Sequence, residues 1–239
     1  MVEQPGSLSN RAVAILLAAV TAIPVLVALV SIRYDQTVTD ANSCDELTLL
    51  LEQQDVEHGM TKNAILLLGD ASVRRWRHRP QKMGQTELMM RTARGLDASL
   101  VAGCFERAVA YYQPAITVFL THKNELMASS KGLQDAIDQI LERRDYYSVS
   151  PFLVFALPPN SPATPNYDPM LKSSVSLLQA VAENQSGVAV IDLSDSLNNT
   201  NGIPDARLFW PDGETPNNEG IRRLMQVLSN QISLQLLTP

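Results

Sequence analysis

Five short apolar runs, separated by longer segments with a helical pattern, restrict the fold of this chain more than any other feature. The runs lie at residues 63–69, 87–93, 115–121, 151–157 and 187–193. Four are nearly continuous in apolar residues, which is typical of strands buried on both faces of a parallel sheet, and the second run is weaker. Segments that favour helices lie at residues 71–78, 97–112, 131–145, 167–183 and 217–236. This alternation predicts a doubly wound α/β sandwich with a five-stranded parallel sheet.

The N-terminal segment predicts a transmembrane anchor. Residues 12–32 carry no charge, and a helix of this length, at ~1.5 Å per residue, crosses a bilayer core of about 30 Å. A cleaved signal peptide is the alternative, but the apolar run exceeds a usual signal-peptide core and no clear cleavage site follows it. We therefore favour an uncleaved anchor. The short tail before it favours an orientation with the C-terminal domain outside the cytoplasm, and we expect the inner membrane and periplasm of a bacterium.

The chain then divides into four segments. These are a tail at 1–11, the anchor at 12–32, a linker with a first helix at 33–60, and the main domain at 61–239. Ser43, followed three residues later by Glu46, predicts the N-terminus of a helix over 43–56. A formal net charge of −6 argues against a general nucleic-acid binder.

Two cysteines, Cys44 and Cys104, leave two alternatives open. In an oxidising compartment they can form a disulfide that ties the segment after the anchor to the domain. They can equally be two unrelated buried thiols. The two cysteines and three histidines of the chain do not cluster in sequence, so we expect no metal site and no cofactor.

The loops after the apolar runs carry the candidate functional residues, because ligands of such folds bind at the carboxyl ends of the strands. The first loop begins in "LLLGDASVRRW", residues 66–76, and the second contains "ARGLDAS" with Gly95. The third is "THKNE" with Asn124, the fourth is the loop 158–165, and the last is "LFWPDGETPNNEGIRRL" before the final helix.

In this order the loops resemble the sequence blocks of the SGNH (GDSL-type) hydrolase family. The Gly-Asp-Ser of the first block is matched except for the serine, whose position holds Ala71. Gly95 matches the glycine of the second block, and Asn124 the asparagine of the third. In the last block, Asp-x-x-His, Asp212 is in place and Thr215 stands where the histidine belongs. The resemblance covers roughly residues 63–236 and implies a three-layer, flavodoxin-like α/β/α sandwich.

The resemblance also implies a catalytic apparatus that has lost two parts. The methyl group of Ala71 cannot attack a carbonyl, and the hydroxyl of Thr215 cannot take a proton near neutral pH. Asp212, the usual partner of the base, has no histidine to orient. The oxyanion donors are retained, namely the N–H groups of Ala71 and Gly95 and the side-chain amide of Asn124. The resemblance therefore favours an inactive relative that binds an acylated or carboxylated ligand, or that is a scaffold for an envelope protein partner.

Other interpretations stay open. An active ester hydrolase or acyltransferase would use Ser72, one residue late, with His122 from the third loop. A shift of one residue turns a helical side chain by about 100°, which carries the Ser72 hydroxyl away from the pocket. A purely structural protein with a collapsed pocket is a third class. Each matched residue also has an ordinary role, since Asn124 and Asp212 suit turns and Gly95 suits a positive φ.

Overall fold

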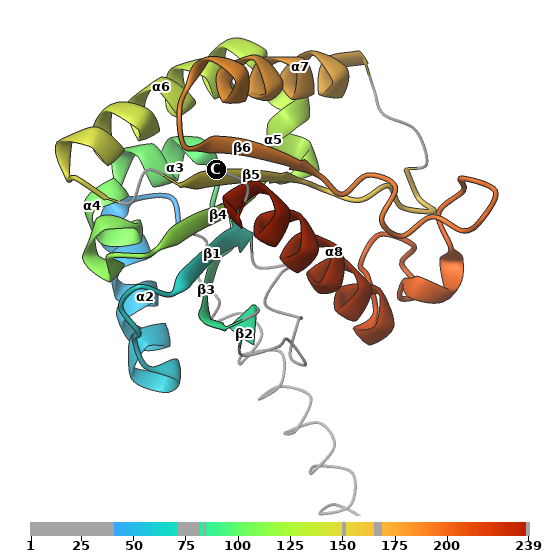
Figure 1. The fold of residues 1–239 in the computed structure, drawn as a ribbon, viewed down its shortest axis with the longest axis horizontal. Helices are drawn as coiled ribbons and strands as arrows, with labels where there is room; N and C mark the ends of the chain where they lie inside the picture. The colour runs from blue at the N-terminus through green and yellow to red at the C-terminus, as the bar shows by residue number, and fades with distance from the viewer. Residues whose placement is uncertain (1–40, 71–81, 84, 150–151, 165–168, 238–239) are drawn as a thin grey trace, which may run out of the picture. The chain divides into compact units, whose positions relative to one another are not determined.

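A six-stranded sheet forms the centre of the domain, in the order β2-β3-β1-β4-β5-β6 (Figure 1). The strands are β1 (Ile65–Asp70), β2 (Lys82–Met83), β3 (Thr86–Ala93), β4 (Ile116–Leu120), β5 (Leu153–Leu157) and β6 (Val188–Asp192). The computed structural model describes residues 41–70, 82–83, 85–149, 152–164 and 169–237. The chain divides into the units 1–39 and 40–239, and all described elements belong to the second.

The predicted five-stranded sheet is corrected to six strands. The five expected strands are present and pair in parallel, in the 2-1-3-4-5 order of flavodoxin-like folds. The sixth strand, β2, pairs antiparallel with the start of β3 at the sheet edge. Its two residues are too few to produce an alternating pattern, which explains why the sequence did not indicate it.

Several predictions from the sequence concern residues outside the described ranges. These are the anchor at 12–32, the first expected helix at 71–78, and the positions of Ala71 and Ser72. Within the ranges that the structure describes, no helix is both long and apolar enough to cross a bilayer.

The sheet separates two apolar cores. Leu66 and Leu68 of β1 face one core, whereas Ile65 and Leu67 face the other, as the alternation of side chains along a strand requires. The first core is covered by α2 (Cys44–His58), α3 (Ala98–Gly103), α4 (Phe105–Ala108), α5 (Lys123–Ala128), α6 (Ser130–Tyr146) and α7 (Pro169–Asn184). Among the described long helices, α8 (Asn218–Leu237) alone packs on the second core (Figure 1).

The segment 97–112, expected as one helix, is broken into three. It contains α3, α4 and the 3-10 helix η2 (Ala110–Tyr112). The first break is at Cys104, which forms a disulfide with Cys44 at the start of α2. The structure thus selects the disulfide from the two alternatives that the sequence left open.

Helix α2 is an integral part of the domain. It begins at Ser43, whose hydroxyl oxygen accepts a hydrogen bond from the Glu46 N–H, as predicted. Its buried residues Leu47, Leu50 and Leu51 lie in the first core.

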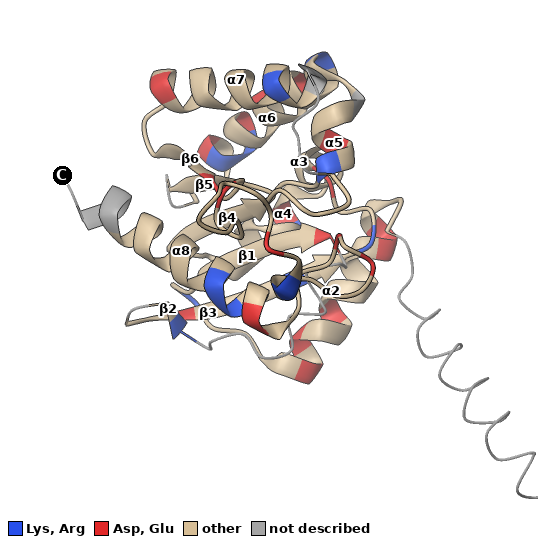
Figure 2. Cartoon of the chain, turned by 90° about the vertical axis from the view of Figure 1, so that its right-hand side faces the viewer, with Lys and Arg blue, Asp and Glu red and all other residues tan. Residues whose placement is uncertain are grey.

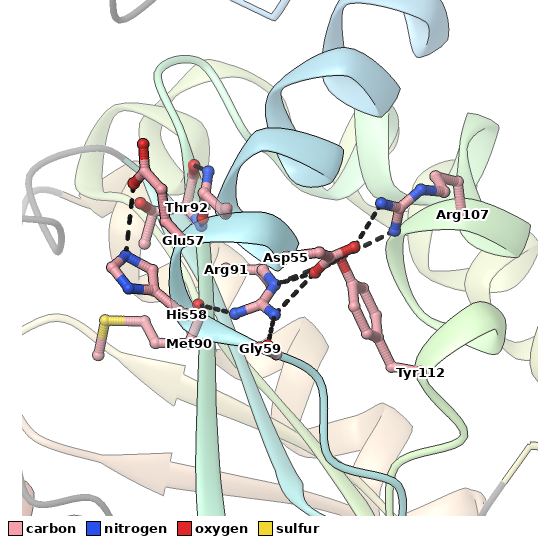
Figure 3. Close-up of polar contacts among 10 residues, drawn as sticks. Asp55, Glu57, His58, Gly59, Met90, Arg91, Thr92, Arg107 and Tyr112 are labelled. Atoms are coloured by element: carbon pink, nitrogen blue, oxygen red, sulfur yellow. Dashed lines mark hydrogen bonds and ion pairs between the residues drawn. The ribbon is translucent and has the colours of Figure 1, made fainter.

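A buried ion-pair cluster joins the end of α2 to the sheet (Figure 3). Arg91 of β3 is 1% exposed and donates from Nε to Asp55 Oδ1 at 2.8 Å. Arg107 donates to Asp55 Oδ2 at 2.7 Å, and the Tyr112 hydroxyl donates to the same carboxylate at 3.1 Å. A charge this deeply buried is tolerated because it is paired and hydrogen-bonded.

Candidate ligand-binding site

A pocket of about 330 Å³ lies at the carboxyl ends of the central strands. Its described walls come from the ends of β1, β4 and β5, from the connections after β4, β5 and β6, and from α8 with the segment before it. The connection between β6 and α8, at the right in Figure 1, faces the viewer in Figure 2. Acidic and basic residues both occur on this side (Figure 2). The end of β1 and the loops after β4 and β5 therefore meet at one cavity. These strands correspond to the first, third and fourth of the five apolar runs that the sequence predicted as strands.

Three of the residues considered from the sequence line this pocket together: His122, Asn124 and Thr215. Asp70, the aspartate directly before Ala71, lines it as well. These side chains come from segments up to 145 residues apart in the chain, Asp70 to Thr215. Ala71 and Ser72 lie outside the described residues, so the structure gives no position for them.

Gly95 is not among the described lining residues of the pocket. Its φ is +77°, the left-handed conformation that glycine adopts at little cost. Its N–H donates to Asp70 Oδ2 at 3.0 Å. The donor that the sequence assigned to an oxyanion is thus directed to a carboxylate of the protein itself, and its use by a ligand stays a prediction.

Asp212 holds the turn that presents Thr215. Its Oδ1 accepts hydrogen bonds from the N–H groups of Glu214 at 2.9 Å and Thr215 at 2.8 Å. The Thr215 carbonyl in turn accepts from the Trp210 N–H at 2.8 Å. The carboxylate expected to orient a catalytic base is therefore used to fix the backbone of the segment before α8.

His122 begins helix α5 and caps it. Its Nδ1 accepts a hydrogen bond from the Asn124 N–H at 3.2 Å. A neutral imidazole that accepts at Nδ1 carries its proton on Nε2. In this arrangement neither ring nitrogen is available to take a proton from a serine hydroxyl.

Glu125 connects the second and third loops, and sequence reasoning missed it. Its Oε1 accepts from the Ala98 N–H at 2.6 Å and its Oε2 from the His122 N–H at 3.4 Å. Burial raises the pKa of this carboxyl from 4.5 to about 7, against the lowering effect of the Ala98 hydrogen bond. The signal in the sequence was a glutamate three residues after His122, the spacing of a capping box.

Lys123 and the pair Ser161 and Thr164 also line the pocket without having been singled out. The Lys123 ammonium donates to the Thr164 carbonyl at 3.2 Å. The hydroxyl oxygens of Ser161 and Thr164 lie 2.7 Å apart, within hydrogen-bond distance. In the part of the chain that the structure describes, no group of His, Cys, Asp and Glu side chains is arranged to hold a metal ion.

Comparison with known proteins places this geometry in a fold family. No protein-family model matches the chain, and no curated protein matches it in sequence. Solved structures do match. A Streptococcus pneumonia protein, provisionally described as a platelet activating factor, superposes with a TM-score of 0.64 at 13% identity, over 86% of this chain and 99% of that one.

Two further solved structures are similar. A GDSL-like lipase from Bacteroides thetaiotaomicron has a TM-score of 0.57 at 13% identity, covering 79% of this chain and 99% of the lipase. An acetyl esterase with a serine-to-alanine mutation, solved with an acetate ion, has a TM-score of 0.51 at 14% identity, covering 72% and 97%. The chain has the SGNH-hydrolase fold. At these identities the likeness concerns the fold and leaves the activity to be argued from the site.

Within the SGNH-hydrolase fold, the pocket contains three of the four sequence blocks. Asp70 belongs to the first block, Asn124 to the third and Thr215 to the last, and all three line the cavity. The second block contributes through Gly95, which contacts Asp70. Residues from three of the four loops that the sequence compared with these blocks therefore line one cavity.

Proposed function

We propose that this protein uses the SGNH-type pocket to bind an acylated or carboxylated ligand without hydrolysing it. The observation that carries the proposal is that Asn124 and Thr215 line one cavity, so that the amide donor is retained where the histidine is replaced. The sequence adds Ala71 at the position of the nucleophile. A pocket with donors for an oxyanion and neither nucleophile nor base favours binding over turnover.

The composition of the pocket supports an acyl ligand. One part of its lining is apolar: Leu120, Ala156, Leu157, Leu193 and Leu224. The polar part includes Asn124, Lys123 and the hydroxyls of Ser161 and Thr164, and it also contains the carboxylates of Asp70 and Glu214 and the side chains of Thr121, His122 and Thr215. Ligand sites typically combine an apolar wall with a few polar groups that fix the orientation. The structurally similar acetyl esterase mutant, in which alanine replaces a serine, was solved with an acetate ion. A protein with this fold and an alanine in place of a serine has thus been solved together with a carboxylate.

We place the domain on the outer side of a membrane, held by the anchor at 12–32. The disulfide between Cys44 and Cys104 supports this location, because disulfides persist in oxidising compartments such as the periplasm. In a bacterial envelope such a domain has access to acylated and carboxylated components, and the same domain can serve as a scaffold for an envelope protein.

The second candidate function is an active ester hydrolase or acyltransferase that uses Ser72 with His122. The location of His122 in the pocket favours it. The capping hydrogen bond at Nδ1 opposes it, because Nε2 can act as a base only in the tautomer whose proton is on Nδ1, and a protonated Nδ1 cannot accept from the Asn124 N–H. This candidate therefore requires helix α5 to give up its cap during the reaction.

Thermal denaturation of the full chain with a carboxylate ligand tests the binding proposal. Sodium hexanoate at ten times its Kd should raise Tm by roughly 3–6 °C relative to sodium chloride. Asn124→Ala should lose most of this gain. Asn201→Ala, which changes an exposed asparagine away from the pocket, should keep it. No gain in the natural protein, or an equal gain in Asn124→Ala, would overturn the proposal.

A further inference from the structure

Lys123 brings a partly buried ammonium group into the pocket. It lines the cavity next to Asn124, and its Nζ donates to the backbone carbonyl of Thr164 at 3.2 Å. Burial lowers the pKa of this ammonium, whereas the charge of Glu214 raises it. A cation moved out of water is costly unless an anion or several hydrogen bonds compensate it.

The protein itself compensates this charge only in part. Among the described residues, no carboxylate forms an ion pair with Lys123. Glu214 lines the same pocket, but it is exposed and acts on Lys123 from beyond ion-pair distance. Asp70 also lines the pocket, and its carboxylate accepts the Gly95 N–H. The Lys123 ammonium is therefore left with a neutral carbonyl as its hydrogen-bond partner.

The apolar lining of the pocket restricts the chemical group to which a bound anion can be attached. Leu157, Leu193 and Leu224 line the cavity, whose volume of about 330 Å³ is near the lower end for small-molecule sites. Such a wall stabilises a short hydrocarbon chain by about 0.8 kcal/mol per buried methylene. The lining of the pocket thus combines a cation and an amide with apolar side chains.

We propose that Lys123 makes the pocket selective for ionised carboxylates, and that the ligand is a short-chain fatty acid whose carboxylate binds Lys123 and Asn124. This inference rests on the proposed function, since it requires the pocket to bind a ligand. An anion at Lys123 forms a charge-assisted hydrogen bond, which is about twice as strong as a neutral one. A neutral ester or amide of the same shape can accept a hydrogen bond from the ammonium, but it brings no negative charge to offset the charge of Lys123.

Three ligands of equal chain length test this selectivity on the full chain by isothermal titration calorimetry: hexanoate, hexanamide and hexylamine. Hexanoate should bind about tenfold more tightly than hexanamide, and hexylamine should bind most weakly. Lys123→Met should reduce the preference for hexanoate to less than twofold, whereas Lys123→Arg should retain it. Lys131→Met, which changes an exposed lysine at the start of α6, is the matched control and should behave like the natural protein.

A second variant tests the role of charge in the pocket by removing a negative charge and leaving Lys123 unchanged. Glu214→Gln removes a negative charge from the pocket and should tighten hexanoate about twofold, with hexanamide unchanged. Glucuronate presents a carboxylate on a polar ring, and it should bind more weakly than hexanoate because the wall is apolar.

The outcomes separate this inference from the proposed function. Equal binding of hexanoate and hexanamide, weakened alike by Asn124→Ala, would overturn the role of Lys123 and leave the binding pocket in place. Tightest binding of hexylamine would show that Asp70 and Glu214 determine selectivity, and would overturn the inference. Tighter binding of glucuronate than of hexanoate would overturn the assignment to a fatty acid. Binding of none of these ligands would overturn the proposed function and the inference together.

Discussion

Glu125 and Ala98, 27 residues apart, are joined by a hydrogen bond of 2.6 Å from the Ala98 N–H to Glu125 Oε1. This contact ties the start of α3 to the start of α5, whose residues Lys123 and Asn124 line the pocket. The carboxyl is buried, and its pKa is raised to about 7. The protonation state of Glu125 thus changes near neutral pH at the contact that joins the starts of α3 and α5.

The first prediction concerns the pH dependence of stability. Because the pKa of Glu125 is 4.5 ordinarily and about 7 in the fold, the folded state binds more protons than the unfolded state between these values. The free energy of unfolding should therefore fall as pH rises from about 4.5 to 7, by at most about 3 kcal/mol, and then level off.

Glu125→Gln removes the titrating group and should flatten this part of the profile. Urea denaturation of the full chain at pH 5 and pH 8 measures the difference. Glu142→Gln, at an exposed position of α6, is the control. A Glu125→Gln profile that falls as steeply as that of the natural protein would contradict the assignment.

The second prediction concerns the ion-pair cluster of Asp55, Arg91 and Arg107 (Figure 3). Asp55→Ala leaves the guanidinium of Arg91 buried without its anion. Removing one partner of a buried pair typically costs 3–5 kcal/mol, so we expect a loss of about that size. Asp138→Ala, at an exposed position on α6, should change the free energy of unfolding by less than about 0.5 kcal/mol. A loss at Asp55 as small as at Asp138 would show that the cluster is solvated.

The third prediction concerns Gly220, in the first turn of α8. A Cβ there would clash with the Leu208 carbonyl oxygen, so the backbone must move to accept alanine. We expect Gly220→Ala to destabilise the protein by about 1–3 kcal/mol.

Gly132 of α6 provides the matched control, because a Cβ there would meet nothing closer than 3.7 Å. Gly132→Ala should be neutral or stabilising by up to about 1 kcal/mol, as helix propensity predicts. Chemical denaturation of both variants gives the comparison, and equal effects at the two positions would refute the close approach of α8 to Leu208.

The five parallel strands were predictable because burial on both faces produces continuous apolar runs, and each of these five lies within about two residues of its run. The break of the helix over 97–112 was not, because it occurs at Cys104, whose partner is 60 residues away. The antiparallel β2 was missed because two residues carry no pattern. Local sequence thus indicates where strands and helices form, whereas the position at which a helix breaks depends on contacts with residues distant in the chain.

The site was predictable to the level of its loops. His122, Asn124 and Thr215 meet at one pocket because the carboxyl ends of parallel strands share an edge. The direction of the Gly95 N–H toward Asp70 could not be predicted, because it depends on side-chain geometry across 25 residues. Lys123 and Glu125 were missed for the same reason, since their environments are set by Thr164 and Ala98.

We propose that the protein retains an SGNH-type pocket without its nucleophile and base. The most direct test compares the natural full chain with the double variant Ala71→Ser, Thr215→His, by labelling with a serine-directed phosphonate and by hydrolysis of p-nitrophenyl acetate. We predict that the natural protein is inert and that the double variant becomes labelled. Labelling of the natural protein, lost in Ser72→Ala, would contradict the account, as would a double variant that binds hexanoate and stays inert.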